Sequence, residues 1–175
     1  MYSGEVYCLQ IDSHMRLVQN WDKLLKEYLG QCPNPSKSII SVYPRGYERD
    51  RFEQPETLEG PLAMCLKEFS KIDSLPRFSS RPIKKSDQLS KPFTSLFWAA
   101  GFSFSYGSLI TDCGYTSEVD DVFFGEELYQ MYKFYKHGYH LFSPPKTLAY
   151  HLWERSYRKT YKGDHTKDDE RRQSQ

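Results

Sequence analysis

The amino-acid sequence predicts an α/β fold in which helices pack against a central mixed sheet. Apolar segments with the composition of strands alternate with segments whose apolar residues recur at helical spacing. The chain has 175 residues, of which 38% are hydrophobic and 16% are aromatic. This length is typical of one domain, and the aromatic content excludes a wholly disordered protein.

The first three predicted elements are a strand, a helix and a second strand. Residues 5–11 (EVYCLQI) are rich in strand formers and lead directly into residues 12–14 (DSH). Residues 15–29 carry apolar side chains at helical spacing, and Gly30 is the expected end of that helix. Residues 38–43 have the composition of a short strand. This order predicts a parallel pair of strands joined by a crossover helix.

The middle of the chain has a different composition. Residues 44–92 contain six of the ten prolines and several charge clusters, which predicts a long irregular excursion. A short strand or a helical turn is expected within it, near residues 62–69. Ordered structure is expected again over residues 94–105. The small residues 99–101 predict a backbone that closely approaches another group.

The last predicted elements are a helix and two strands. The helix is expected to begin at Glu126 and Glu127 and to end at His137 and Gly138. Residues 139–142 and 147–153 are expected to be extended. The side of the helix expected to face the core or adjoining loops carries Leu128, Met131, Tyr132 and Tyr135. We expect one domain over residues 1–158 and a charged, disordered tail over residues 159–175.

The charge and cysteine pattern excludes several classes of protein. Lys and Arg number 24 against 23 Asp and Glu, so there is no global basic field for a nucleic-acid partner. No apolar run approaches the ~18 residues of a membrane span, and the first residues do not resemble a signal peptide. The unevenly spaced cysteines favour free thiols in a reducing compartment over a zinc motif or a disulfide scaffold. They are Cys8, Cys32, Cys65 and Cys113.

Three groups of residues could carry chemistry. Asp12 and His14 are two residues apart in extended chain, so their side chains can share one divalent cation such as Mn²⁺. Asp12 could instead cap the following helix. His151 is either a satisfied core histidine or a third ligand. Glu126 and Glu127 either interact favourably with the positive end of the helix dipole or place a carboxylate in a cleft.

Several short segments follow one another in order along the chain. They are residues 10–16 (QIDSHMR), 20–22 (NWD), 41–44 (SVYP), 46–47 (GY), 97–105 (FWAAGFSFS), 122–128 (VFFGEEL) and 150–153 (YHLW). In this order they resemble a known family of enzymes, the polypeptide α-N-acetylglucosaminyltransferases. Members include the cytoplasmic enzyme that modifies hydroxyproline on a ubiquitin-ligase adaptor and the trypanosomatid mucin enzymes. The related mucin-type GalNAc-transferases carry a similar DxH, a similar helix start and a late metal-binding histidine.

The resemblance implies a GT-A-like fold and a role for each matching residue. The implied reaction transfers N-acetylglucosamine from UDP-GlcNAc to a hydroxyl of a polypeptide (Ser, Thr or hydroxyproline), with retention and with Mn²⁺ or Mg²⁺. The metal ligands would be Asp12, His14 and His151. Glu126, or less favourably Glu127, would contact the donor sugar or the acceptor. The substrate-binding residues would be Trp98, Ala100, Gly101, Phe102, Arg155 and Arg158.

The family pattern also implies a nucleotide-binding β-α-β segment before the metal motif, whereas few residues precede Asp12. We therefore expect the C-terminal part of a catalytic domain, which would bind the UDP-sugar weakly and transfer little or no sugar. The alternatives are a non-catalytic remnant that binds a partner or metal, and an unrelated metal-dependent hydrolase. The expected compartment is the cytoplasm, or the Golgi if a preceding segment carries a signal anchor.

Overall fold

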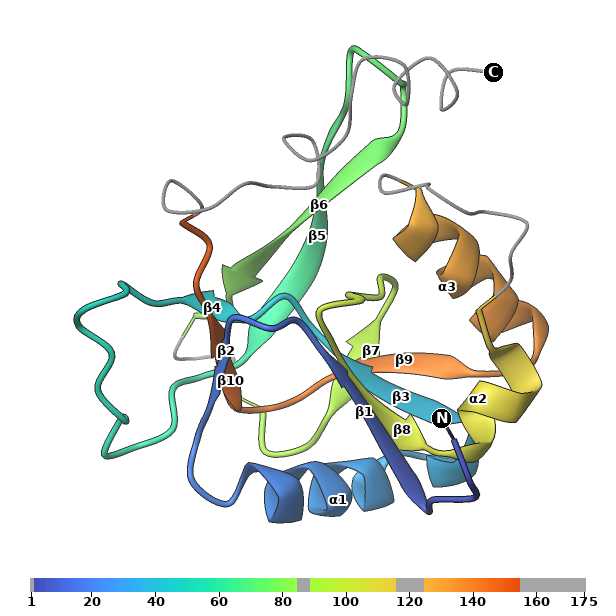
Figure 1. Cartoon of the computed structure of the whole chain (residues 1–175), viewed down its shortest axis with the longest axis horizontal. Helices are drawn as coiled ribbons and strands as arrows, with labels where there is room; N and C mark the ends of the chain where they lie inside the picture. Colours follow the sequence, from blue (N-terminus) through green and yellow to red (C-terminus); the bar gives the residue numbers. More distant parts are fainter. Residues whose placement is uncertain (1, 85–88, 116–124, 155–175) are drawn as a thin grey trace.

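A five-stranded mixed sheet forms the centre of the molecule (Figure 1). The computed structural model describes residues 2–84, 89–115 and 125–154. Neighbouring strands are antiparallel except for β3 and β9, which are parallel. The predicted α/β class with a mixed sheet is confirmed. In spatial order the strands are β1 (Tyr7–Ile11), β8 (Phe102–Tyr106), β3 (Ser38–Ser41), β9 (His140–Ser143) and β7 (Phe93–Ser95).

Strands β1 and β3, which the sequence predicted to be a neighbouring parallel pair, run in the same direction but are not neighbours. Strand β8 lies between β1 and β3 and is antiparallel to both. Phe104 of β8 lies opposite Leu9 on one side and Ile40 on the other, and its side chain is buried. A strand from later in the chain therefore separates the two strands that the local order of elements predicted to be neighbours.

Helices cover both faces of this sheet. The adjacent residues Ile39 and Ile40 are fully buried and belong to two different apolar clusters, since successive strand residues point to opposite faces. The cluster around Ile40 includes buried residues of α1 (Trp21–Gln31). The cluster around Ile39 includes residues of α2 (Ser108–Cys113) and α3 (Glu126–Lys136). The result is a layer of helix on each side of the sheet.

The first helix begins later than the sequence predicted. Residues Met15–Leu17 form strand β2, and α1 begins only at Trp21. Asn20 between them has a left-handed backbone with φ of 58°. Met15 and Leu17 are partly buried while Arg16 is exposed, which is strand periodicity. The helix then runs through Gly30 to Gln31, and a short 3₁₀ turn (Pro35–Lys37) leads into β3.

A small second sheet carries the end of the described chain. Its spatial order is β2, β10 (Ala149–His151) and β4 (Arg45–Gly46). Strand β10 is antiparallel to β2 and parallel to β4. This pairing sets His151 opposite Met15 on one side and Gly46 on the other. The late histidine is thereby brought next to the chain that follows Asp12.

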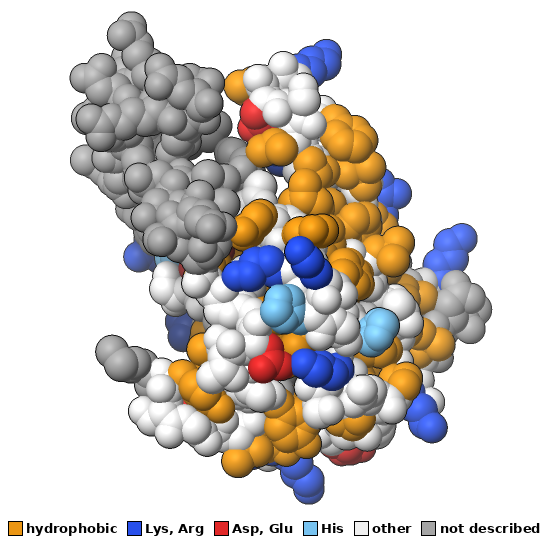
Figure 2. All heavy atoms as spheres, turned by 90° about the vertical axis from the view of Figure 1, so that its right-hand side faces the viewer, with side chains coloured by type: hydrophobic (Ala, Val, Ile, Leu, Met, Phe, Trp, Pro, Cys, Tyr) orange, Lys and Arg blue, Asp and Glu red, His pale blue; other side chains and the backbone are white. Residues whose placement is uncertain are grey.

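The predicted irregular excursion contains a long β-hairpin, so that prediction is wrong in part. Strand β5 (Leu62–Phe69) confirms the expected strand near residues 62–69, and it pairs with β6 (Pro76–Pro82). The hairpin projects from the body in Figure 1. Hydrophobic side chains gather over α3 and the hairpin in the upper part of Figure 2. Phe69 and Ile72 are 63% and 90% exposed.

Helix α3 confirms the expected start at Glu126 and the expected end. His137 follows the last turn, and Gly138 has the left-handed φ of 76° that favours glycine. The face predicted to meet the core or adjoining loops is confirmed in part, because Met131 packs against the cluster around Ile39 and the Tyr135 hydroxyl donates to the Leu96 carbonyl at 3.0 Å. Tyr132 is 59% exposed instead, and the buried residue Phe134 was not predicted. Across the residues that the structure describes, no helix has the length and apolarity of a membrane span. The expected tail over 159–175 lies outside the described residues.

Candidate functional site

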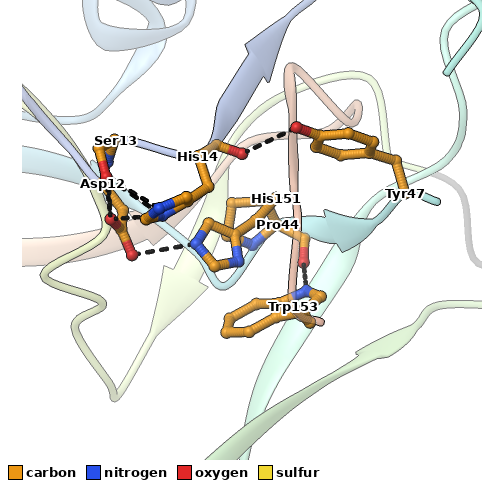
Figure 3. A network of polar contacts seen from close by, with 7 residues as sticks. All are labelled: Asp12, Ser13, His14, Pro44, Tyr47, His151 and Trp153. Carbon is orange, nitrogen blue, oxygen red and sulfur yellow. Dashed lines mark hydrogen bonds and ion pairs between the residues drawn. The ribbon is translucent and has the colours of Figure 1, made fainter. Parts of the chain in front are cut away.

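Asp12, His14 and His151 converge on one point, as predicted (Figure 3). His151 Nε2 lies 3.0 Å from Asp12 Oδ2, and His14 Nδ1 lies 3.1 Å from Asp12 Oδ1. One ligand atom from each of the three residues lies within 4.8 Å of the others. The carboxylate thus sits between two imidazoles, and together the three side chains could hold one metal ion.

Neighbouring backbone and rings hold the three side chains in place. The Asp12 N–H donates to the Gly101 carbonyl at 3.0 Å, and the Leu152 N–H donates to the His14 carbonyl at 3.2 Å. The Tyr47 hydroxyl also donates to that carbonyl, at 3.3 Å (Figure 3). The His151 ring packs edge-on against Trp153, with centroids 4.3 Å apart. The site is therefore built by both sheets and by the chain between them.

The surroundings of Asp12 favour the charged form of its carboxylate, which lies beside the imidazoles of His14 and His151. Burial acts to raise the pKa of Asp12, but hydrogen bonds from His151 and from the Ser13 N–H, with the charges of both histidines, hold it below its usual range. His151 is only 2% exposed. One carboxylate oxygen and two imidazole nitrogens form a donor set that suits Mn²⁺ and neighbouring divalent metals. The residues present therefore fit a divalent cation.

A cleft of about 910 Å³ is lined by Asp12 and His151 of the candidate cation site and by four of the six other predicted site residues that the structure describes, Ala100, Gly101, Glu126 and Glu127. This volume falls in the range of about 300–1,000 Å³ that is usual for small-molecule sites. One side is formed by Asp12, His151, Ala100, Gly101 and the start of α3. The hairpin supplies most of the other side through β6, together with Lys67 of β5.

The two glutamates at the start of α3 have different surroundings. Gly125, with φ of 107°, turns the chain into the helix, and Glu126 and Glu127 both line the cleft. The carboxylate of Glu127 accepts the Ala100 N–H at 2.9 Å through Oε1 and the Tyr43 hydroxyl through Oε2. Burial raises the pKa of Glu127, the two hydrogen bonds oppose this, and the charge of Glu126 adds to it.

Two of the predicted substrate-binding residues belong to the core instead. Trp98 and Phe102 are each 1% exposed and are not among the residues that line the cleft. The Trp98 indole N–H donates to Ser103 Oγ at 2.8 Å inside the apolar layer under α3. The predicted role of both as substrate contacts therefore needs correction. Arg155 and Arg158 lie outside the described residues.

The sequence interpretation missed residues on the hairpin and after β3. Lys67 and Arg77 line the cleft, and the sequence did not indicate them because the hairpin was expected to be irregular. Tyr43 stands in a segment that carried the family resemblance, but no role was assigned to it. Its hydroxyl contacts Glu127, a residue 84 positions away. Such a contact leaves no local pattern in the sequence.

Comparisons with known proteins place this geometry in context. The protein-family model described as Glycosyltransferase (GlcNAc) matches residues 1–175. No curated protein matches the chain. A crystal structure of GalNAc-T7 with UDP, GalNAc and Mn²⁺ is similar in fold, with a TM-score of 0.58 at 13% sequence identity. The similarity covers 87% of this chain and 28% of that one. The chain therefore has a GT-A-like fold and belongs to the Glycosyltransferase (GlcNAc) family.

Proposed function

We propose that this chain acts in the transfer of N-acetylglucosamine from UDP-GlcNAc to a hydroxyl group of a polypeptide, at Ser, Thr or hydroxyproline. The proposed reaction retains the anomeric configuration and depends on a divalent cation, Mn²⁺ or Mg²⁺. The observation that carries the proposal is the convergence of Asp12, His14 and His151 beside the start of α3. Family membership supports glycosyl transfer as the reaction class.

In this proposal Asp12, His14 and His151 hold the cation. When bound, the cation supplies Lewis-acid stabilisation of the charge that develops on the departing UDP. The solved GalNAc-T7 structure contains UDP, GalNAc and Mn²⁺, which supports the donor class and the metal proposed for this chain. The choice of GlcNAc over GalNAc is supported by the description of the family that matches.

The remaining cleft residues would bind and orient the two substrates. Gly101 has no side chain, so a sugar ring can lie close to its backbone. A Cβ added to Gly101 would lie 3.7 Å from the Cβ of Asp12. Glu126 would accept a hydrogen bond from a hydroxyl of the sugar or the acceptor, and β6 would face the acceptor polypeptide.

A transfer assay tests the proposal. The purified full chain would be incubated with UDP-GlcNAc or UDP-GalNAc and with peptides that carry Ser, Thr or hydroxyproline, with and without Mn²⁺. Mass spectrometry should detect a Mn²⁺-dependent GlcNAc adduct at low yield, because donor binding is expected to be weak, and NMR of the product should show the α-anomer. Asp12→Asn should abolish the adduct. Transfer of GalNAc in preference, a β-linked product or transfer that ignores Mn²⁺ would contradict the proposal.

A further inference from the structure

The backbone of residues 99–101 is held by side chains from three elements. Ser41 Oγ, on β3, accepts the Ala99 N–H at 2.8 Å and donates to the Ala99 carbonyl at 3.1 Å. Glu127 of α3 accepts the Ala100 N–H at 2.9 Å, and Gln10 Nε2 of β1 donates to the Ala100 carbonyl at 2.9 Å. Side chains thus fix the Ala100 peptide groups on both sides.

The next carbonyl along the loop connects this arrangement to the cation site. The Gly101 carbonyl accepts the Asp12 N–H at 3.0 Å, so the loop and the metal motif share a hydrogen bond. The Cβ of Asp12 also lies close beside Gly101. A displacement of Ala100 would therefore move the surface of the cleft relative to Asp12.

Glu127 is oriented by a second partner. Its other oxygen accepts the hydroxyl of Tyr43, which follows β3, and the Tyr43 ring packs edge-on against Trp153 at 6.0 Å. Burial, followed by the charge and hydrogen bond of Glu127, raises the pKa of Tyr43, which keeps the proton on the hydroxyl and makes it the donor. Both oxygens of Glu127 thus accept a hydrogen bond from a group of the protein.

We propose that Glu127 and Tyr43 are positioning residues that fix the peptide of Ala100 against Asp12 and so determine where the donor sugar lies. This inference rests on the proposed function and deepens it. It separates the two glutamates, because Glu126 would act on substrate while Glu127 acts through the loop. Loss of Glu127 should weaken recognition of the sugar and leave binding of the cation and of UDP unchanged.

The test combines a structural measurement with a binding measurement on the full chain. Hydrogen exchange of the Ala100 amide, followed by NMR, reports directly on the Glu127 hydrogen bond. Calorimetry with UDP and with UDP-GlcNAc, both in Mn²⁺, gives the contribution of the sugar to affinity. The variants are Glu127→Ala, Tyr43→Phe and the conservative Glu127→Gln, with Glu126→Gln as the matched control for the exchange measurement alone.

We expect Glu127→Ala to speed Ala100 exchange by about tenfold or more, because hydrogen bonds to charged groups are strong ones. Tyr43→Phe should give a smaller increase, and Glu127→Gln should restore most of the protection since its amide can still pair with both partners. Glu126→Gln should leave exchange at the wild-type rate. Glu127→Ala should also bind UDP-GlcNAc no better than UDP, with the affinity for UDP itself retained.

The possible outcomes separate this inference from the proposed function. Wild-type exchange in both Glu127→Ala and Tyr43→Phe would overturn the positioning role, and Tyr43→Phe decides it if Glu127→Ala does not fold. Faster exchange with an unchanged sugar contribution would overturn the role in sugar placement. If the wild-type chain binds neither ligand, the proposed donor is wrong, and the exchange rates still decide whether Glu127 holds the loop.

Discussion

At the scale of single residues, the two adjacent glutamates of α3 provide the sharpest contrast in the cleft. Glu127 is tied to Tyr43 and to the Ala100 N–H, whereas Glu126 lines the same cleft near Tyr115, whose pKa is raised mainly by burial and in part by Glu126. In the proposed function these two neighbours would serve different purposes, Glu127 within the protein and Glu126 toward the substrate.

The first prediction concerns Glu126. The substitution Glu126→Gln keeps the size of the side chain and removes its charge. If the carboxylate assists a proton or a hydroxyl in the transition state, kcat should fall by about 100-fold or more, as is usual for such groups. The measurement is steady-state transfer of GlcNAc, with the melting temperature as the check on folding. An unchanged kcat would reduce Glu126 to a favourable residue in the first turn of a helix.

The second prediction concerns the pH dependence that Glu127 confers. Its pKa is raised above 4.5, so the folded state holds this proton more tightly than the unfolded state does. The folded state then binds more protons, and the free energy of unfolding contributed by Glu127 falls as pH rises from about 4.5 through the folded pKa. In metal-free buffer, wild type should lose stability relative to Glu127→Gln across that window. A constant difference between the two proteins would refute the raised pKa.

At the scale of elements, each of the two long helices has a glycine near its C-terminal end, and the two glycines have different roles. Gly138 follows α3 with φ of 76°, a conformation that disfavours any side chain, while Gly30 lies within α1 with open space where a Cβ would be. One glycine is needed for the turn of the chain. The other only weakens its helix.

Alanine at each glycine should therefore have opposite effects. Gly138→Ala should lower the free energy of unfolding by about 1–2 kcal/mol, the cost of a left-handed backbone with a side chain. Gly30→Ala should raise it by about 0.5–1 kcal/mol, because alanine favours the helix. Urea denaturation of both variants measures the two values. Destabilisation at both sites would contradict the open space beside Gly30.

Element prediction from the sequence succeeded where the pattern was local. The start and end of α3 follow from its two glutamates and its terminal glycine, and β1 follows from its run of strand formers. It failed at Met15–Leu17, because an apolar spacing compatible with a helix is also compatible with a strand, and pairing with β10 decided between them. In the hairpin, β5 was expected but β6 was not, because its sequence PRFSSRP carries the charges and prolines typical of loops.

At the scale of the whole molecule, the candidate cation site connects the two sheets. Asp12 follows β1 of the large sheet, and His151 belongs to β10 of the small one. Asp12 and His14 could be predicted as candidate ligands because they lie two residues apart, whereas His151 was assigned as a ligand through the family resemblance. Their closeness to His151, 139 positions further along than Asp12, depends on strand pairing that no local pattern contains. Trp98 and Phe102 were predicted to contact substrate but are buried in the core. A sequence motif alone does not distinguish a side chain in the core from one that lines a cleft.

A cation that joins two sheets should stabilise the whole chain. A ligand that binds only the folded state raises stability with its concentration, by about 2.7 kcal/mol at 100 times its dissociation constant. Differential scanning calorimetry with increasing Mn²⁺ should show a rising melting temperature that EDTA reverses. Ca²⁺ at the same concentrations should raise it less, because imidazole ligands suit Mn²⁺ better. Equal shifts with both ions would indicate weak binding to scattered carboxylates.

The most direct test of the cation site is a calorimetric titration of Mn²⁺ into the full chain. We predict one Mn²⁺ per wild-type chain. Asp12→Asn, which keeps the shape of the side chain, should weaken binding by about 100-fold or more, since even outer partners of metal ligands contribute about 10–100-fold. Asp22→Asn is the matched control, because Asp22 is an exposed residue of α1 paired with Lys26. Equal Mn²⁺ affinities in wild type and Asp12→Asn would contradict the proposed site.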